Sequence, residues 1–432
     1  MYRELLALEE RGAPVRVAVV GAGGSMGLGV SLQLGKSPGL RLAAAVDVDV
    51  ARATQAATLS GRPWTLASTD AEVTRALRNG STVVTADIFP LLARGREAVD
   101  VLVESTNTVA FAARAVESAL RAGIDVVLMN AEVDCLLGPR LHAIARESGT
   151  IVTSDAGDQH GVLMRMIDEI RLWGFEIVMA GNIKGFLDRH ATPTSIAEEA
   201  RKRNLNPVMC AAYTDGTKLN IEMALVANAT GLVPAQRGML GPRAGHVSEV
   251  FGKFDLASLR NPGVVDYVLG AEPGGGVYVV GHSGDPVQQS YLAYYKMGQG
   301  PFYLFYRPYH LCHLETPWAI ASAAVARRPI LAPAGRPVAD VVTFAKTDLT
   351  QGTELPIGIG SEHVYGMIDR QSVCVAKGAV PICLLDHESK PAARVRRRIS
   401  RDQLVTWDDL EIPAGPLIDA YRAQQRLLGL TD

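Results

Sequence analysis

Apolar runs alternate with amphipathic stretches along the first third of the chain. Residues 15–20 form a β-branched run that is apolar on both faces, as a buried parallel strand should be. Similar runs predict strands at 40–47, 99–106 and 125–134, and amphipathic stretches predict helices at 108–123 and 138–149. Strand–helix–strand repetition is typical of an α/β fold with a doubly wound parallel sheet. We therefore predict such a domain at residues 1–160.

The pattern changes after residue 160. An apolar strand is predicted at 175–181, and strand-like alternation with glycine turns at 274–317 predicts an antiparallel sheet. We expect a second, α+β domain at residues 161–330. Its last helix, at 316–326, is rich in small residues and is expected to pack back on the first domain.

A proline-rich join near residues 330–337 separates the last part of the chain. Two segments beyond it, "AKTDLTQGTEL" and "ISRDQLVTWDDLEIP", each combine an apolar core with a turn and an acidic cap. Such segments predict short strands and turns. We therefore expect a small β-rich domain at residues 335–432.

A glycine-rich turn, "AVVGAGGSMGLGVS", connects the first predicted strand to a helix. Gly21 permits the tight turn, Gly23 lets the backbone approach a pyrophosphate, and Gly27 lets the helix pack close to the strand. Ser25 and Met26 begin the helix, where free N–H groups attract phosphate, and the Ser25 hydroxyl can add a hydrogen bond. This pattern predicts a dinucleotide site, and the alternative is a structural glycine turn in another α/β fold.

The ends of later strands carry further polar residues for this site. Asp47 ends the second strand, where an acid that binds the ribose is expected. Its carboxylate favours NAD because it repels a 2′-phosphate, while the nearby Arg52 keeps NADP open. Thr106 and Asn130 follow two other strands and are expected to line the nicotinamide half, the alternative being that they only cap the next helices.

Polar groups also cluster after the strand predicted at 175–181. Asn182, Lys184, Arg189 and His190 fall in what we interpret as a binding loop, in which the two cations suit a phosphate or carboxylate. An ordinary exposed loop is the alternative. His310 lies in an H-x-x-H-x-E pattern that lacks a further ligand at metal-site spacing, so we expect it to hydrogen-bond substrate and expect no metal.

The segment "DGTKLNIEMALVANATGL" predicts a helix capped by Thr214 or Asp215 and stopped at Gly231. Asp215, Lys218 and Glu222 fall on one face of this helix at spacings of three and four residues. A lysine between two carboxylates can deliver or remove a proton at a carbonyl or alcohol. The alternative is an ordinary surface pair of Lys218 with Glu222.

Composition narrows the classes of partner. The 432 residues carry a net charge of −2, which draws the protein neither to nucleic acid nor to an anionic membrane. No apolar stretch is long enough for a membrane span. The five scattered cysteines favour a reducing cytoplasm over a disulfide framework. We expect a cytoplasmic homo-oligomer, a dimer or tetramer, that acts on a small molecule.

Several segments together resemble a known family: "VAVVGAGGSMG", "VDVLVEST", "DGTKLNIEMALVANATGL", "YRPYHL" and "AKTDLTQGTEL". They are similar to the homoserine dehydrogenase-like oxidoreductases with a C-terminal SAF (antifreeze-like) domain, and among these to the 1-deoxyxylulose 5-phosphate (DXP) reductoisomerase-like family. The resemblance implies a Rossmann domain with NAD or NADP, an α/β domain with substrate groups and dimer contacts, and an SAF-like domain at 335–432.

These features lead to one main hypothesis. It is an NAD(P)-dependent oxidoreductase acting on a small anionic polyhydroxylated carbonyl compound in the cleft between the first two domains. Lys218 would protonate or stabilise the alkoxide, oriented by Asp215 and Glu222. The resemblance implies, more specifically, conversion of 1-deoxy-D-xylulose 5-phosphate to 2-C-methyl-D-erythritol 4-phosphate in isoprenoid biosynthesis. The alternatives are reduction of an amino-acid semialdehyde and a non-catalytic dinucleotide sensor.

Overall fold

Two units, each built around its own sheet, make up the structure, which is a computed structural model describing residues 1–202, 205–386, 388 and 391–430. Unit 1 comprises residues 1–161 and 311–332. Unit 2 comprises residues 162–310 and the chain from Pro333 onward. The last region therefore groups with residues 162–310, and its status as a separate SAF-like domain stays a prediction.

Unit 1 is built on a seven-stranded parallel sheet with the order β3-β4-β2-β1-β5-β6-β7. The strands are β1 (Val15–Val20), β2 (Leu40–Val46), β3 (Trp64–Leu66), β4 (Thr82–Thr85), β5 (Val101–Glu104), β6 (Asp125–Leu128) and β7 (Val152–Ser154). Strands β4, β5 and β6 are buried along their whole length, because helices cover both faces. The predicted α/β fold with a doubly wound parallel sheet is confirmed.

Helices cover this sheet on both sides. They are α1 (Tyr2–Glu10), α2 (Ser25–Leu34), α3 (Val50–Leu59), α4 (Asp70–Arg78), α5 (Phe89–Leu92), α6 (Val109–Arg121), α7 (Ala131–Ser148) and α15 (Cys312–Ala324), with a 3-10 turn at Gly95–Glu97. Right-handed crossovers place α2 and α3 on one face and α4 to α7 on the other. That arrangement leaves the half of the first face over β5, β6 and β7 for another element.

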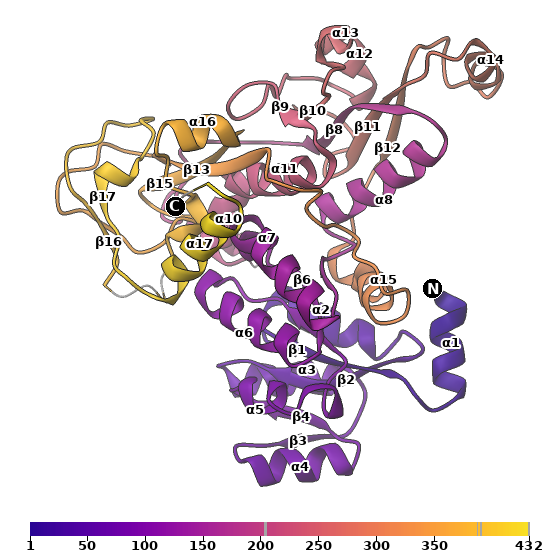
Figure 1. Cartoon of the computed structure of the whole chain (residues 1–432), viewed down its shortest axis with the longest axis vertical. Helices are drawn as coiled ribbons and strands as arrows, with labels where there is room; N and C mark the ends of the chain where they lie inside the picture. Colours follow the sequence, from indigo (N-terminus) through magenta and orange to yellow (C-terminus); the bar gives the residue numbers. More distant parts are fainter. Residues whose placement is uncertain (203–204, 387, 389–390, 431–432) are drawn as a thin grey trace. The chain divides into compact units, whose positions relative to one another are not determined.

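Helix α15 fills this place. It packs against α2 and against β5, β6 and β7, although it lies more than 150 residues beyond β7 in the chain (Figure 1). Its small residues Ala319, Ala321 and Ala323 are fully buried, which allows close packing on the sheet. The first sheet is therefore completed by a helix from a distant part of the sequence.

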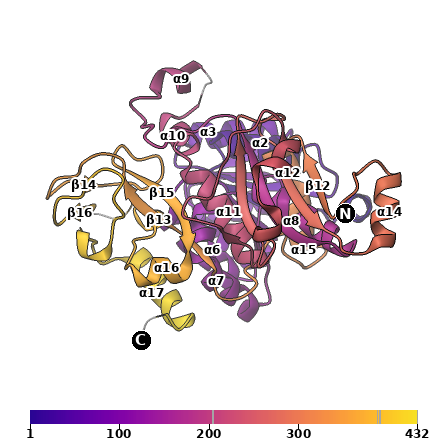
Figure 2. The same ribbon diagram turned by 90° about the horizontal axis from the view of Figure 1, so that it is seen from above.

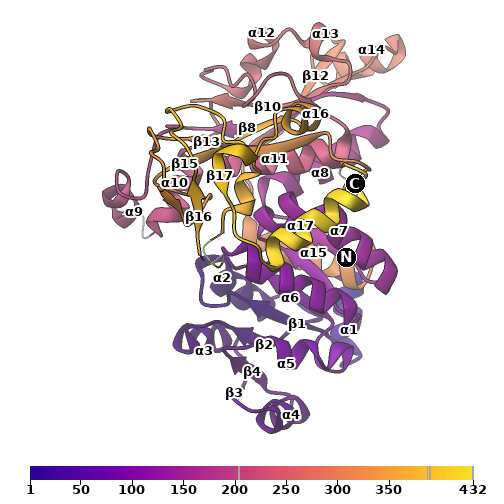
Figure 3. The ribbon, with the colours of Figure 1, turned by 60° about the vertical axis from the view of Figure 1, so that its left-hand side comes forward.

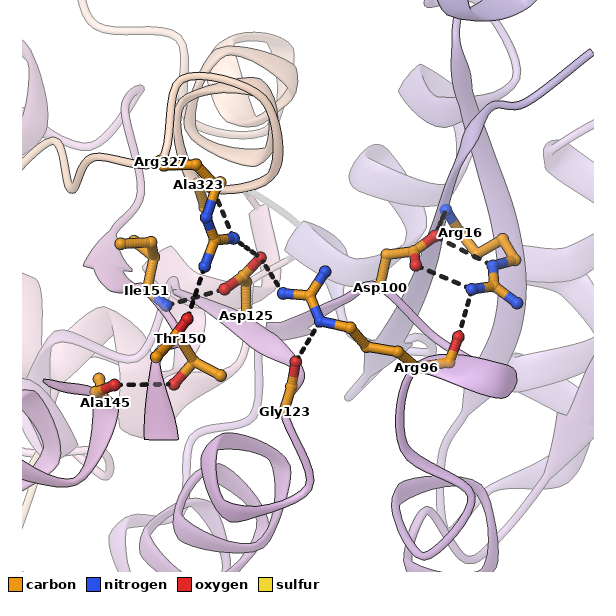
Figure 4. A network of polar contacts seen from close by, with 11 residues as sticks. Arg16, Arg96, Asp100, Gly123, Asp125, Ala145, Thr150, Ile151, Ala323 and Arg327 are labelled. Atoms are coloured by element: carbon orange, nitrogen blue, oxygen red, sulfur yellow. Dashed lines mark hydrogen bonds and ion pairs between the residues drawn. The ribbon is translucent and has the colours of Figure 1, made fainter. Parts of the chain in front are cut away.

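A buried carboxylate holds the end of α15 at the edge of the sheet where the parallel strands begin (Figure 4). The fully buried Asp125 accepts hydrogen bonds from Arg96, 2.9 Å away, from the Ile151 backbone at 2.8 Å, and from Arg327, just beyond α15. Arg327 also donates to the carbonyl of Gly149 at 2.8 Å. A charge in the interior needs such partners, so this network fixes the returning segment.

Unit 2 contains a mixed five-stranded sheet with the order β12-β11-β8-β10-β9. The strands are β8 (Glu176–Lys184), β9 (Val233–Pro234), β10 (Val264–Leu269), β11 (Val277–His282) and β12 (Phe302–Arg307). Strands β8, β9 and β10 run parallel, while β11 is antiparallel to both β8 and β12. The expectation of an antiparallel sheet was thus right for the β11–β12 pair and wrong for the sheet as a whole, since β8 is joined to β10 through helices.

The helices of unit 2 vary from single turns to four turns. They are α8 (Gln159–Leu172), which begins in unit 1, α9 (Ala197–Lys202), α10 (Pro207–Thr214), α11 (Thr217–Thr230), α12 (Val250–Lys253), α13 (Leu256–Leu259) and α14 (Pro286–Tyr294), with a 3-10 turn at Val247–Glu249. Helix α11 packs against β8 and β10 on one side and against the C-terminal strands on the other (Figure 2). All residues from 217 to 227 are consequently buried.

The C-terminal region contains two small antiparallel sheets. Strands β13 (Ala339–Ala345) and β15 (Val364–Arg370) form one, and β14 (Glu354–Leu355), β16 (Ala393–Val395) and β17 (Leu410–Glu411) form the other. Helices α16 (Gln371–Ala376) and α17 (Pro416–Leu427) and 3-10 turns at Ile382–Leu384 and Trp407–Asp409 complete it. Helix α17, labelled in Figure 3, carries Tyr421, which stacks on Trp407 with ring centroids 6.0 Å apart. The expected β-rich character of this region is confirmed.

Three predicted boundaries were wrong. Residues 131–134 begin α7 rather than ending a strand, because the Asn130 side chain accepts from the Val133 N–H and caps the helix. Strand β8 runs on to Lys184 because its end still pairs with β10. Helix α15 begins at Cys312, four residues earlier than expected. Among the described residues, no helix combines the length and apolarity needed to cross a bilayer.

Replacing Asp125 should destabilise the fold. In Asp125→Asn, two arginines lose their shared anion, and we expect the free energy of unfolding to fall by about 2–4 kcal/mol. Asp348→Asn is the matched control, because Asp348 forms an exposed pair with Arg398 at 3.0 Å and should cost less than about 1 kcal/mol. Urea denaturation measures both values, and equal losses in the two variants would contradict a buried role for Asp125.

Candidate functional site

The glycine turn of unit 1 leaves no room for side chains. Gly21 has a φ of 76°, and a Cβ there would lie 2.9 Å from the backbone of Ser105 and Thr106. A Cβ at Gly27 would lie 2.2 Å from the carbonyl oxygen of Gly21, so α2 packs directly on the turn. These are the close approaches that a pyrophosphate-binding turn requires.

Asp47 is fixed beside this turn. Its Oδ2 accepts a hydrogen bond from the Gly23 N–H at 2.9 Å, and its Oδ1 accepts from the Asp49 N–H at 2.9 Å. A Cβ at Gly23 would lie 2.5 Å from the Cβ of Arg52 and 2.9 Å from Asp47 Oδ2. Asp47 and Arg52, the two residues expected to influence the preference between NAD and NADP, therefore both lie beside the turn. The turn and Asp47 fit a dinucleotide.

The first turn of α2 is open to a phosphate. Its N-cap, Gly24, supplies no side-chain hydrogen bond, and Ser25 and Met26 are exposed. The first N–H groups of a helix have no partner within the helix, and with the helix dipole they attract anions. The predicted phosphate contacts of Ser25 and Met26 stay predictions that this exposure supports.

At the ends of β5 and β6, the polar side chains are engaged with one another. Thr106 donates from its hydroxyl and its backbone N–H to Glu104, and Asn130 donates to the Thr108 carbonyl at 2.9 Å. The Asn130 side-chain oxygen also accepts the Val133 N–H at 3.1 Å and so caps α7, the role that was the alternative to cofactor binding. Whether it and Thr106 also touch nicotinamide stays a prediction.

Glu104, to which the sequence had assigned no role, is fully buried at the end of β5. Burial raises the pKa of its carboxyl to about 8, against the opposing effect of hydrogen bonds from Thr106. The Glu104 carboxyl is therefore protonated in most molecules at neutral pH. The only signal in the sequence was an acid that ends an otherwise apolar strand.

Two of the three predicted catalytic residues, Lys218 and Glu222, lie on α11, and the third, Asp215, does not. The helix begins at Thr217 after Gly216, whose φ is 86°, and Asp215 belongs to the C-terminal end of α10. Lys218 and Glu222 remain one turn apart on α11, and both are buried. Asp215 therefore does not share a face of α11 with Lys218 and Glu222, because the left-handed Gly216 interrupts the helix, and a direct action of Asp215 on Lys218 stays a prediction.

Asp215 instead pairs with Lys346, a residue of the C-terminal region that the sequence analysis missed. The Nζ of Lys346 lies 2.8 Å from Asp215 Oδ2, and both side chains are fully buried. Burial raises the pKa of the Asp215 carboxyl, while the Lys346 ammonium opposes that shift. A lysine directly after the apolar run "ADVVTFA" was the only signal for Lys346.

The expected helix stop at Gly231, at the other end of α11, is confirmed.

Glu222 receives two groups from β8. Asn182 donates from Nδ2 to Glu222 Oε2 at 3.1 Å, and Lys184 Nζ lies 3.9 Å from the same oxygen. Asn182 and Glu222 are buried, whereas Lys184 is partly exposed. Both β8 residues were expected in a loop and lie on the strand instead. The structure thus brings Asn182, Lys184 and Glu222 together, with Lys184 as the member that solvent reaches.

The other predicted substrate residues lie in different surroundings. His190 contacts Asp402 at 2.8 Å and Arg401 at 2.7 Å through its two ring nitrogens, and the exposed Arg189 lies over the ring of Tyr365. The Nδ1 of His310 lies 2.7 Å from the Gly275 carbonyl oxygen, and the Gly275 N–H donates to the carbonyl of Ile183 in β8. His310 is therefore held near the end of β8, while His190 is held by the C-terminal region.

Two family models match this chain. Residues 40–154 match the NAD binding domain of homoserine dehydrogenase, and residues 157–316 match the catalytic domain of oxidoreductase DRL. These matches confirm the resemblance inferred from the sequence motifs, NAD(P) as cofactor and an enzymatic role. A comparison with curated proteins found no match.

Solved structures with some similarity include three dehydrogenases or related enzymes. 1-Deoxy-D-xylulose 5-phosphate reductoisomerase from Zymomonas mobilis, in complex with NADPH, is 18% identical over 48% of this chain and 57% of its own, with a TM-score of 0.35. A probable dehydrogenase from Thermotoga maritima is 11% identical over 74% and 90%, with a TM-score of 0.40. Scyllo-inositol dehydrogenase from Lactobacillus casei is 12% identical over 62% and 66%, with a TM-score of 0.32. This chain spans less than two thirds of the first and third of these proteins.

A side chain at Gly23 should weaken cofactor binding. In Gly23→Ala the added methyl group collides with Arg52 and Asp47, so the turn must move, and we expect affinity for NADH or NADPH to fall at least about tenfold. Gly252→Ala is the control, because a Cβ there meets nothing within 4 Å. Calorimetric titration of both variants measures the change, and unaltered affinity in Gly23→Ala would contradict this turn as the phosphate site.

The buried Glu104 should make stability depend on pH. Because its pKa is about 8 in the folded state and near 4.5 when unfolded, folding retains a proton between these values. The free energy of unfolding should therefore fall as pH rises from about 5 to 8, and Glu104→Gln should remove this part of the loss. Denaturation series at several pH values test it, and a difference between the two proteins that does not change with pH would contradict it.

Proposed function

We propose a reaction for this NAD(P)-dependent oxidoreductase, whose residues 157–316 match the catalytic domain of oxidoreductase DRL. The reaction is reduction of the carbonyl group of a small anionic polyhydroxylated compound, or the reverse oxidation. The observation that carries the proposal is the group formed by Asn182, Lys184 and Glu222 next to Lys218 on α11. It combines buried proton-transfer groups with one cation that solvent reaches.

Each side chain has a role in this proposal. Lys184 binds the anionic group of the substrate, because it is the partly exposed cation. Lys218 donates a proton to the carbonyl oxygen as negative charge develops there. Glu222 orients these cations and is itself oriented by the Asn182 amide. Arg189, His190 and His310 remain proposed substrate contacts, and Asp215 acts only through the start of α11.

The cofactor is held, in this proposal, by the glycine turn, the first turn of α2 and Asp47. When bound, NAD(P)H supplies the hydride that adds to the carbonyl carbon while the carbonyl electron pair moves to oxygen. Lys218 then provides the proton that completes the alcohol, and solvent restores it. In the oxidation direction the unprotonated Lys218 accepts the hydroxyl proton.

The finer proposal is a reductoisomerase reaction on 1-deoxy-D-xylulose 5-phosphate, which would give 2-C-methyl-D-erythritol 4-phosphate. It is supported by the family match and by the cation at the end of β8, which suits a phosphate. Homo-oligomer formation is likewise a proposal and rests on the family resemblance. A panel of sugar phosphates, sugar acids and amino-acid semialdehydes, followed by the absorbance of the reduced cofactor, tests the substrate class. Turnover of semialdehydes alone would overturn it.

Removal of Lys218 should slow the chemical step. In Lys218→Ala we expect kcat to fall on the order of 100-fold or more, the usual contribution of a positioned proton donor, with NAD(P)H affinity unchanged. Lys253→Ala is the control, since Lys253 pairs with Glu249 on α12 at 3.6 Å and has no proposed role. Steady-state kinetics with the panel compound that is turned over measures both, and parental kcat in a folded Lys218→Ala would overturn the role.

A further inference from the structure

Lys346 is a fully buried lysine from the C-terminal region that reaches the start of α11. Its Nζ lies 2.8 Å from Asp215 Oδ2 and donates to the carbonyl oxygens of Ala191 at 2.6 Å and Ser361 at 2.7 Å. The ammonium group therefore makes one ion pair with a carboxylate and two hydrogen bonds to carbonyl oxygens. Its position is therefore fixed from three directions, by segments far apart in the sequence.

Asp215 transmits this position to α11. Its Oδ1 accepts the Thr217 N–H at 2.7 Å, so one carboxylate joins Lys346 to the first residue of the helix. Lys218, the proposed proton donor, is the next residue. Since Gly216 adopts a left-handed conformation at the junction, the direction of α11 depends on what holds Asp215.

Two further hydrogen bonds attach the same helical turn to β15. The Thr217 hydroxyl oxygen accepts the Gly366 N–H at 2.9 Å, and the Asn220 side-chain oxygen accepts the Ile368 N–H at 2.9 Å. Lys218 lies between these two residues. The C-terminal region thus fixes the turn that carries the proposed proton donor, on both sides of it.

The same ammonium also fixes the chain after β8. Ala191, whose carbonyl it binds, follows directly on Arg189 and His190, and the Asp188 N–H donates to the Thr214 carbonyl at 2.8 Å. The segment with two proposed substrate contacts and the helix with the proposed proton donor therefore share one anchor. Because Lys346 is fully buried among these three partners, it does not itself reach substrate.

We propose that Lys346 is a positioning residue, and that the C-terminal region serves the reaction by holding α11 and the 188–191 segment in place through it. This inference rests on the proposed function, in which Lys218 is the proton donor that must be positioned. It assigns the C-terminal region a part in catalysis that does not require this region to bind any ligand.

The test removes both charges of the pair at once. Lys346→Met alone would leave Asp215 buried without its counter-ion, which is destabilising, whereas the double variant Lys346→Met/Asp215→Asn leaves no charge unpaired. The matched control is Arg398→Gln/Asp348→Asn, which removes an exposed pair in the same C-terminal region. Circular dichroism and calorimetric titration with NADPH establish that each variant folds and binds cofactor.

Three measurements then decide the role. With the panel compound that the parent turns over, the double variant should lose on the order of 100-fold in kcat, the usual effect of a displaced catalytic group, with a smaller change in KM. The alkaline limb of its pH–rate profile, which reports deprotonation of the donor, should shift. Hydrogen–deuterium exchange, which needs no substrate, should quicken at residues 215–221 and 188–191 while β8 and β10 stay protected.

The outcomes separate this inference from the function on which it rests. Parental kcat, pH profile and exchange in a folded double variant would overturn the positioning role alone, provided that Lys218→Ala is impaired. Parental kcat in Lys218→Ala would overturn both. Faster exchange throughout unit 2 would show a general structural role and would also overturn the inference.

Discussion

The burial of α11 is the constraint on which the candidate site depends. Residues 217–227 are all buried, although this stretch carries Lys218, Asn220 and Glu222. A buried polar group without a partner costs on the order of 1–3 kcal/mol, so the surrounding segments must supply partners. Strand β8 supplies partners to Glu222, and β15 supplies one to Asn220. The packing that removes α11 from water thereby also fixes the groups around its charged side chains.

In unit 1, the residues expected to bind the cofactor and a network that stabilises the fold lie at opposite edges of one sheet. The glycine turn, Asp47 and the buried Glu104 lie at the carboxyl ends of the strands, where open α/β sheets bind ligands. The Asp125 network lies at the opposite edge and holds the end of α15. Because α15 completes the helical layer, a segment distant in sequence is part of the cofactor-binding fold. The two family models meet at residues 154–157, close to the division of the structure between residues 161 and 162, and α15 is the segment that returns to unit 1.

Short-range patterns carried much of the prediction. The strand at residues 15–20, the close packing at the glycine turn and the helix stop at Gly231 all depend on neighbouring residues, and each was found. The predicted common helical face of Asp215 and Lys218 was wrong, because the left-handed Gly216 ends one helix and precedes the next between them. A helical spacing holds only while the helix continues, and no periodicity in this segment reveals that it is interrupted.

The sequence by itself determined the fold class, the dinucleotide turn and the residues Lys218, Glu222, Asn182 and Lys184 as candidates, because strand and helix periods and glycine conformations are local properties. Only the tertiary structure decided which of them meet. It joined Asn182 to Glu222 over 40 residues and Lys346 to Asp215 over more than 100. Such pairings follow from the burial of α11 between two sheets, and the free energy of that burial belongs to the folded chain as a whole rather than to any segment of it.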